Sequence, residues 1–210
     1  MSTRHNSLGQ EIGSSLPTWN TCPKPADKTM VGAYCRLEAL DATRHGEDLW
    51  QAYSADTEDR IWTYLPYGPF TTQTELKQWL TDHSAIQDPL FYAIISTSSG
   101  KAVGIATYLR IQPAAGVIEV GHINYSPALQ ATTAATEAMY LMMKNAFDLG
   151  YRRYEWKCDN LNLHSKKAAR RLGFSFDGLF KQAAVYKGRN RDTAWFSILD
   201  THWPAIQAEY

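Results

Sequence analysis

The sequence lacks paired cysteines, long apolar runs and a net charge. Its three cysteines, among 210 residues, are odd in number and widely spaced, which excludes a disulfide framework and the close ligand spacing of a metal site. No segment approaches the roughly 20 apolar residues that cross a bilayer, and the N-terminus carries no apolar signal-peptide run. With 21 Lys and Arg against 21 Asp and Glu, no overall field favours nucleic acid or a membrane surface. These absences predict a cytoplasmic protein without a metal, a membrane partner or a nucleic-acid partner.

Charge is nevertheless divided unevenly along the chain. Residues 1–150 hold 10 Lys and Arg against 15 Asp and Glu, whereas residues 151–210 hold 11 against 6. Two interpretations are open: two solvated faces, or an acidic site entrance for a cationic substrate beside a basic site entrance for an anionic one. The composition, 44% hydrophobic and 20% charged, is that of a globular protein. We expect residues 1–30, rich in Ser, Thr, Pro, Asn and Gly, to form a loosely packed arm and residues 31–210 to form a single domain.

The pattern of apolar residues predicts an α+β fold with a mixed, mostly antiparallel sheet flanked by helices. Strands are expected over 34–40 and 151–159, where apolar or aromatic residues alternate with polar ones, and over the strand-like runs 91–97, 101–111 and 116–125, with two more within 175–199. Helices are expected where apolar residues recur every three to four positions, over 42–53, 72–86, 133–149 and 161–174, with a short one from 201. Three consecutive antiparallel strands followed by a helical crossover favour a mixed sheet over a doubly wound parallel one.

The segment 126–149 has two possible helix starts. Ser126-Pro127 resembles a cap followed by proline at the first helical position, which would make one long helix. Alternatively, 126–131 is a turn and the helix begins at Thr132 or Thr133. The second version leaves free backbone N–H groups at a helix N-terminus directly after a strand, where the unpaired donors and the helix dipole both favour an anion.

Four pieces of sequence resemble, in order and spacing, the Gcn5-related N-acetyltransferases (GNAT), within the branch of the ribosomal-protein N-terminal acetyltransferases RimJ and RimL. "IEVGHINYSP" (118–127) resembles the Glu-x-Gly-aromatic strand of that branch, and "QATTAATEAM" (130–139) its pyrophosphate loop followed by Thr-Glu-Ala. "CDNLNLHSKKAARRLGF" (158–174) resembles Asn-x-x-Ser followed by Leu-Gly-Phe, and "GRNRDTAWFSI" (188–198) the last strand pair. One departure stands out: Thr133 occupies a position where the family usually has glycine.

The resemblance implies transfer of an acetyl group from acetyl-CoA to a primary amine, such as a protein or peptide N-terminus or a small amine. The residues expected to bind the cosubstrate are Ile123 and Tyr125 through main-chain groups, Gln130, Thr132, Thr133, Ala134 and Ala135 at the pyrophosphate, Asn162 for orientation, and Lys167 or Arg170 at the 3′-phosphate. No metal is implied.

Glu119 is the first candidate for the base that takes a proton from the amine. It is a carboxylate within the apolar strand "GVIEVGHI", where desolvation would raise its pKa toward a useful value. The alternative is a salt-bridged strand glutamate. His122 has a suitable unperturbed pKa, but a lone strand histidine is more often structural.

Ser165 is the candidate acid for the departing thiolate. It matches the serine that this branch places near the sulfur, and the alternative is a simple helix cap paired with Asn162. Tyr154 and Tyr186 remain alternative acids.

A different class of function also fits the sequence. Thr133 at the loop position could leave a catalytically silent acyl-CoA-binding regulatory module. The aromatic-rich segment 61–70 could line the acceptor site or form a homodimer contact. The acceptor amine is not identified by the sequence.

Overall fold

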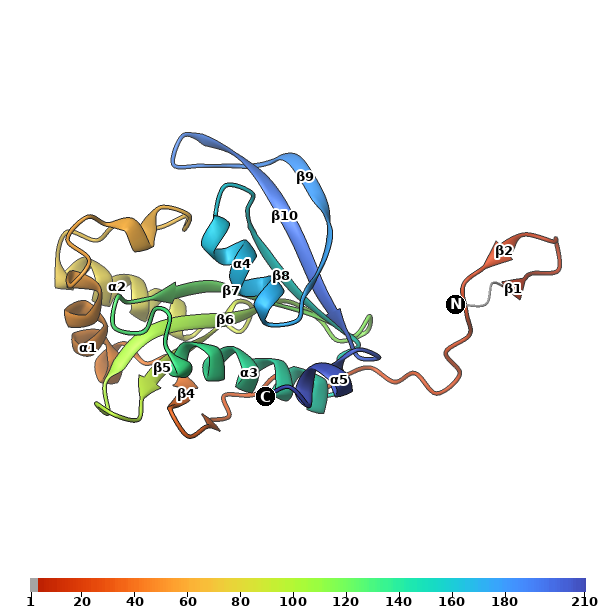
Figure 1. Cartoon of the computed structure of the whole chain (residues 1–210), viewed down its shortest axis with the longest axis horizontal. Helices are drawn as coiled ribbons and strands as arrows, with labels where there is room; N and C mark the ends of the chain where they lie inside the picture. Colours follow the sequence, from red (N-terminus) through yellow and green to blue (C-terminus); the bar gives the residue numbers. More distant parts are fainter. Residues whose placement is uncertain (1–3) are drawn as a thin grey trace.

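A computed structural model describes residues 4–210, and an eight-stranded sheet lies at its centre (Figure 1). The strands follow the order β3-β4-β5-β6-β7-β8-β10-β9 across the sheet. Their bounds are Met30–Val31 (β3), Cys35–Ala39 (β4), Leu90–Ser96 (β5), Ala102–Gln112 (β6), Val117–Tyr125 (β7), Arg153–Asp159 (β8), Ser175–Tyr186 (β9) and Arg189–Leu199 (β10). Neighbours are antiparallel except β7 and β8, which are parallel. The predicted mixed α+β sheet is therefore confirmed.

The helices begin and end at residues suited to those positions. Their bounds are Ala42–Ser54 (α1), Gln73–Ser84 (α2), Thr133–Asp148 (α3), Leu163–Arg171 (α4) and Trp203–Gln207 (α5), with a short 3-10 turn at Arg60–Trp62 (η1). The Asp41 carboxylate accepts hydrogen bonds from the first turn of α1, and the Thr72 hydroxyl does the same for α2. Beyond α4, Gly173 adopts a φ of +92°, the left-handed conformation that commonly follows a helix.

The sheet is covered on both faces by helices along its first half. Because side chains of a strand alternate between faces, β5 contributes to two cores. Leu90, Tyr92 and Ile94 lie in the core shared with α3, whereas Phe91, Ala93 and Ile95 lie in the core shared with α1 and α2. On the β7–β8–β10 half, Ile118 and Val120 continue the α3 core, so Glu119 between them points to the opposite face.

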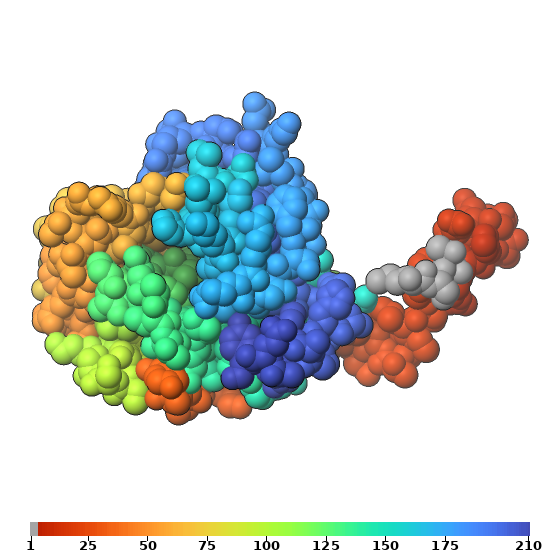
Figure 2. Space-filling model, viewed as in Figure 1, coloured from red at the N-terminus to blue at the C-terminus, as the bar shows by residue number. Residues whose placement is uncertain are grey.

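The N-terminal segment leaves the body of the molecule. Residues 4–18 stand clear of it and carry the short hairpin of β1 (Arg4–His5) and β2 (Glu11–Ile12), which the sequence pattern did not predict (Figures 1 and 2). Contact with the body begins at Trp19, whose indole N–H donates to the carbonyl of Ala114 at 2.9 Å. Residues 1–3 of the predicted arm lie outside the described residues.

Candidate active site

The centre of the site is the point where β7 leaves β8. Their last paired residues are Val120 and Trp156, yet β7 continues to Tyr125. A β-bulge lies just beyond, where His122 has a φ of +47° and β7 gains one residue over β6. The end of β7 therefore has no strand partner on the β8 side, and its edge is available for another extended chain.

Buried polar atoms gather on this unpaired stretch of β7. The Nδ1 of His122, both side-chain polar atoms of Asn124 and the Oγ of Ser126 have no hydrogen-bond partner within residues 4–210. Asn124 is 1% exposed and Ser126 is fully buried. Because a buried polar group costs free energy unless it is hydrogen-bonded, these groups suit a stretch that binds a polar molecule.

The N-terminus of α3 lies directly after this stretch. The helix begins at Thr133, which confirms the second of the two predicted starts. The Thr132 hydroxyl caps it by accepting from the N–H of Ala135 at 3.1 Å. Within the described part of the chain, the N–H groups from Ala131 to Ala134 have no acceptor, and the Thr133 side chain is exposed. The free donors and the dipole make this helix end suited to a phosphate.

Glu137 fixes this end of α3 to the sheet, a contact that sequence reasoning missed. Its carboxylate accepts three backbone hydrogen bonds from the β3–β4 turn, from Ala33, Tyr34 and Cys35 at 2.7, 2.7 and 2.8 Å. A side chain on Gly32 would collide with that carboxylate. The one signal in the sequence was the isolated charge in the otherwise uncharged first turns of the helix.

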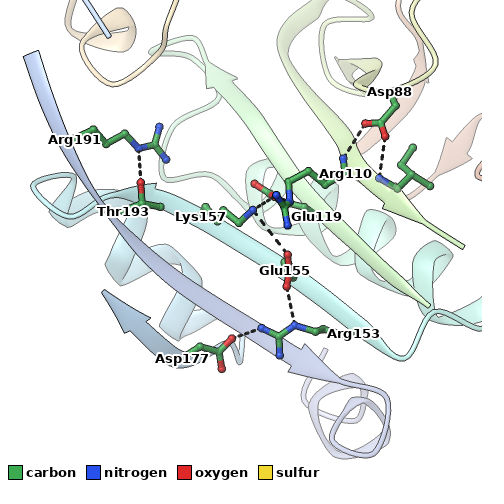
Figure 3. A network of polar contacts seen from close by, with 10 residues as sticks. Asp88, Arg110, Glu119, Arg153, Glu155, Lys157, Asp177, Arg191 and Thr193 are labelled. Atoms are coloured by element: carbon green, nitrogen blue, oxygen red, sulfur yellow. Dashed lines mark hydrogen bonds and ion pairs between the residues drawn. The ribbon is translucent and has the colours of Figure 1, made fainter. Parts of the chain in front are cut away.

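Glu119 lies on β7 two residues before the bulge and is 5% exposed. Its Oε2 forms ion pairs with the Lys157 Nζ at 2.6 Å and the Arg110 Nε at 3.2 Å (Figure 3). Its Oε1 lies 3.8 Å from the position that a Cβ on Gly121 would occupy. Burial raises the pKa of Glu119, and Lys157 and then Arg110 partly offset that rise. One oxygen is thus held by cations while the other faces the start of the unpaired stretch.

Ser165 lies on the β8 side of the same junction. Asn162 caps α4 by accepting from the Ser165 N–H at 3.0 Å, and the Ser165 Oγ accepts from the Trp156 indole N–H at 2.9 Å. Since Trp156 is the last β8 residue paired with β7, the serine is tied to the junction. The same hydroxyl also hydrogen-bonds the Cys158 thiol, whose pKa burial raises and Ser165 partly lowers. The backbone contact is the one expected of a helix cap, whereas the indole contact was not predicted.

The two basic residues predicted for the 3′-phosphate, both on α4, have different surroundings. Lys167 is exposed, whereas the Arg170 guanidinium lies over the Phe196 ring, 5.6 Å from its centroid. The neighbouring Arg171 donates to the Thr136 hydroxyl in the first turn of α3 at 3.0 Å. Arg171, rather than Arg170, is therefore the arginine beside the helix N-terminus.

The two alternative tyrosines differ in position. Tyr154 is fully buried in the α3 core, where its ring packs against Phe174 and burial raises its pKa. Tyr186 donates to the Asp159 carboxylate at 2.8 Å, and burial together with Asp159 raises its pKa to about 12. Tyr154 therefore lies in the core, and only Tyr186 is near the end of β8.

The segment 55–71 bridges the unpaired end of β7 and the β9–β10 hairpin. The Tyr67 ring stacks on His122 at a centroid distance of 5.6 Å. The Lys187 ammonium donates to the Trp62 carbonyl at 2.8 Å, and the Arg189 guanidinium to the Thr63 carbonyl at 2.7 Å. The aromatic segment 61–70 therefore lies between the end of β7 and the β9–β10 hairpin. Burial lowers the pKa of His122 to about 4, so its imidazole is neutral at pH 7.

Among residues 4–210 no three His, Cys, Asp or Glu side chains are grouped as metal ligands. No helix in the same range has the length and apolar character to cross a membrane. All three cysteines are free and buried.

A mixed sheet that separates between two parallel strands, with free helix amides after the separating strand, is the architecture of an acyl-CoA-dependent N-acyltransferase. Residues 36–175 match the family profile described as "Acetyltransferase (GNAT) domain". The chain belongs to the GNAT acetyltransferases, in the RimJ/RimL-type family.

Solved structures agree with this assignment. A GCN5-related N-acetyltransferase from Brucella melitensis is 48% identical over 92% of this chain and 88% of its own, with a TM-score of 0.90. A GNAT-family protein from Chromobacterium violaceum is 43% identical over 92% of this chain and 96% of its own, with a TM-score of 0.85. The Salmonella typhimurium acetyltransferase that modifies the N-terminal serine of ribosomal protein L7/L12 shares the fold at 20% identity, covering 82% of this chain and 99% of its own, with a TM-score of 0.70. A search of curated proteins finds no match.

Proposed function

We propose that this GNAT acetyltransferase moves an acetyl group from acetyl-CoA to a primary amine at the junction of β7 and β8, with Glu119 as base and Ser165 as acid. The observation that carries the proposal is the position of Glu119 Oε1, which faces Gly121 while Oε2 is held by two cations. When bound, acetyl-CoA supplies the activated acetyl group. The remaining chemistry belongs to the side chains of this protein.

The residues around the junction fit acetyl-CoA. The free amides between Gln130 and Ala135, with the hydroxyl of Thr133 beside them, offer donors to a diphosphate, whereas the Thr132 hydroxyl already donates to the Leu129 carbonyl at 2.7 Å. Ile123 and Tyr125 lie on the stretch of β7 that β8 leaves unpaired, where a peptide-like pantetheine arm can add as an extra strand; the Tyr125 carbonyl already accepts from the Gln130 side-chain amide at 3.0 Å. Asn162 orients the start of α4, and Lys167 is a free cation for a 3′-phosphate.

Glu119 and Ser165 divide the proton transfers. A primary amine is protonated at pH 7 and attacks only after losing a proton, which the Glu119 carboxylate takes directly or through water. Burial raises the pKa of Glu119, which makes its carboxylate a stronger base. The Ser165 hydroxyl, oriented by the Trp156 indole, gives its proton to the departing thiolate.

The acceptor enters from the side of segment 55–71. That segment and the more acidic first 150 residues favour a cationic amine, and a peptide N-terminus meets this demand. The Salmonella typhimurium relative of the same fold modifies an N-terminal serine, so a peptide beginning with Ser is the first acceptor to test. Three free buried thiols agree with a reducing, cytoplasmic setting. We also retain the homodimer as a proposal.

The alternative is a silent acyl-CoA-binding module, favoured by Thr133 at the loop position. Release of free thiol from acetyl-CoA is measured with the full chain and a panel of peptide N-termini, aminoacyl compounds and small amines. Calorimetry with CoA accompanies it. We expect binding and turnover on one class of acceptor. Binding without turnover across the panel selects the silent module, and the absence of CoA affinity contradicts both functions.

A further inference from the structure

Two buried carboxylates face each other across the parallel strands β7 and β8. Glu119 and Glu155 are register partners, and each is 5% exposed. The Lys157 ammonium, two residues further along β8, is 2.6 Å from the Glu119 Oε2 and 3.9 Å from the Glu155 Oε2 (Figure 3). Two like charges side by side disfavour each other's ionisation, and one ammonium on the same face of the sheet counters this.

Lys157 is held in place by an aromatic ring. Its Nζ lies 3.7 Å from the centroid of Trp195, which is also its register partner on β10. The Lys157 side chain is only 11% exposed, so both the cation–π contact and the ion pair operate with little screening by water. The ammonium is therefore fixed by Glu119 and Trp195, whereas the Glu155 Oε2, at 3.9 Å, has no hydrogen-bond partner within residues 4–210.

Arg110 provides a natural comparison. Its Nε reaches the same Glu119 oxygen at 3.2 Å, and its guanidinium lies 5.3 Å from the same Trp195 ring. However, its side chain is 48% exposed, so water screens its interaction with the carboxylate. The buried cation Lys157 should therefore lower the pKa of Glu119 more than the exposed Arg110 does.

The charges around Glu119 predict opposite effects from neighbouring substitutions. Burial raises its pKa, Lys157 and Arg110 lower it, and Glu155 raises it further. Trp195 on β10 adds no formal charge. One step further out, Arg153 contacts both Glu155 and Asp177, which partly balances that carboxylate. Loss of Lys157 would leave Glu119 protonated to higher pH, and loss of the Glu155 charge would do the reverse.

We propose that Lys157, packed against the Trp195 ring, is a positioning residue for acetyl transfer. Its ion pair with Oε2 holds Glu119 ionised and leaves Oε1 directed at Gly121. The inference rests on the proposed role of Glu119 as base. It assigns to Lys157 no contact with the substrate.

The test is the pH dependence of kcat/KM. In Lys157→Met, the acid limb of this profile, where activity falls as Glu119 is protonated, should move to higher pH by about one pH unit or more. This is the size expected when an opposite charge is removed from within hydrogen-bond distance. Arg110→Gln, the matched control, should move it less, and Lys157→Arg should restore part of the parent profile. Glu155→Gln should move the limb downward. CoA affinity and thermal unfolding, measured on every variant, report whether the fold is intact.

Two outcomes overturn the inference. One is a Lys157→Met enzyme whose rate falls by the same factor at every pH with the limb unmoved. The other is a Glu155→Gln enzyme in which the acid limb of the pH profile stays in place or moves upward. This second result can be obtained even if Lys157→Met does not fold. The base role is tested separately, because Glu119→Gln at the parent rate contradicts the proposed mechanism itself. If Glu119→Gln is slow and the acid limb of Lys157→Met is nevertheless unmoved, only the role of Lys157 is contradicted.

Discussion

Replacing Glu137 with alanine tests how α3 is fixed to the sheet beside the proposed diphosphate site. The carboxylate accepts three N–H groups, and the donors differ in burial: Ala33 and Tyr34 are exposed, whereas Cys35 is fully buried. Water can replace the carboxylate at the two exposed donors, but the Cys35 N–H would be left unpaired at a cost of about 1–3 kcal/mol. With a smaller loss at the exposed pair, we expect Glu137→Ala to lower the free energy of unfolding by about 2–4 kcal/mol.

Urea unfolding followed by tryptophan fluorescence measures this loss. Glu137→Gln keeps one acceptor oxygen and should fall between the parent and alanine. Lys144→Gln, which removes only the exposed Lys144–Asp148 pair on the same helix, should change stability by less than about 0.5 kcal/mol. CoA affinity should fall with Glu137→Ala and not with Lys144→Gln, because only the first loosens the amides at the helix start.

A double-mutant cycle sharpens the result. A side chain on Gly32 would collide with the Glu137 carboxylate, so Gly32→Ala should destabilise the parent and have a smaller effect in the Glu137→Ala background. A Glu137→Ala protein within about 0.5 kcal/mol of the parent, or additive effects in the cycle, would refute this account of the α3 attachment.

Three further results are expected. Thr133→Glu should abolish CoA binding in calorimetry by repelling the diphosphate, whereas Thr57→Glu, the same charge at another exposed site, should not; unchanged affinity in Thr133→Glu would locate the phosphates elsewhere. The folded-state pKa of His122, lowered by burial to about 4, lies below that of the unfolded chain, so this residue's contribution to stability is present above pH ~6.5 and is lost as the pH falls toward 4. His122→Phe should therefore flatten the dependence of the urea midpoint on pH in that window, and an unchanged slope contradicts the assigned shift. Burial raises the pKa of Cys35 to about 12, and the other two thiols are also buried, so a thiol reagent at pH 8 should react with the folded protein slowly and with all three cysteines after unfolding; fast reaction of the native protein contradicts the burial.

The sequence predicted local structure well because the relevant signals are local. Alternation of apolar residues marked β4, a continuous apolar run marked β5, and Asp41 marked the start of α1. The start of α3 was left between two versions, and the structure decides it through Thr132, whose hydroxyl can cap only a helix that begins at Thr133. The β1–β2 hairpin was missed because its two-residue strands leave no periodic pattern.

The contacts that build the site are long-range, and no sequence pattern contains them. Glu119 and Lys157 are 38 positions apart, and Glu137 reaches donors more than 100 positions earlier. The strand register brings Glu119, Glu155 and Lys157 to one face, and the sequence gives strands but not their register. The two interpretations of Glu119, as a base and as a salt-bridged glutamate, are both compatible with the geometry. The ion pairs use Oε2 and leave Oε1 outside them.

The most direct test of the central claim is the rate of acetyl transfer by Glu119→Gln, measured against pH beside CoA affinity. The substitution removes the proton acceptor and keeps the shape of the side chain. We predict a fall in kcat of about 10²–10⁴-fold, the usual contribution of a general base, with CoA affinity within about twofold of the parent. Equal rates for Glu119→Gln and the parent at every pH would contradict the claim.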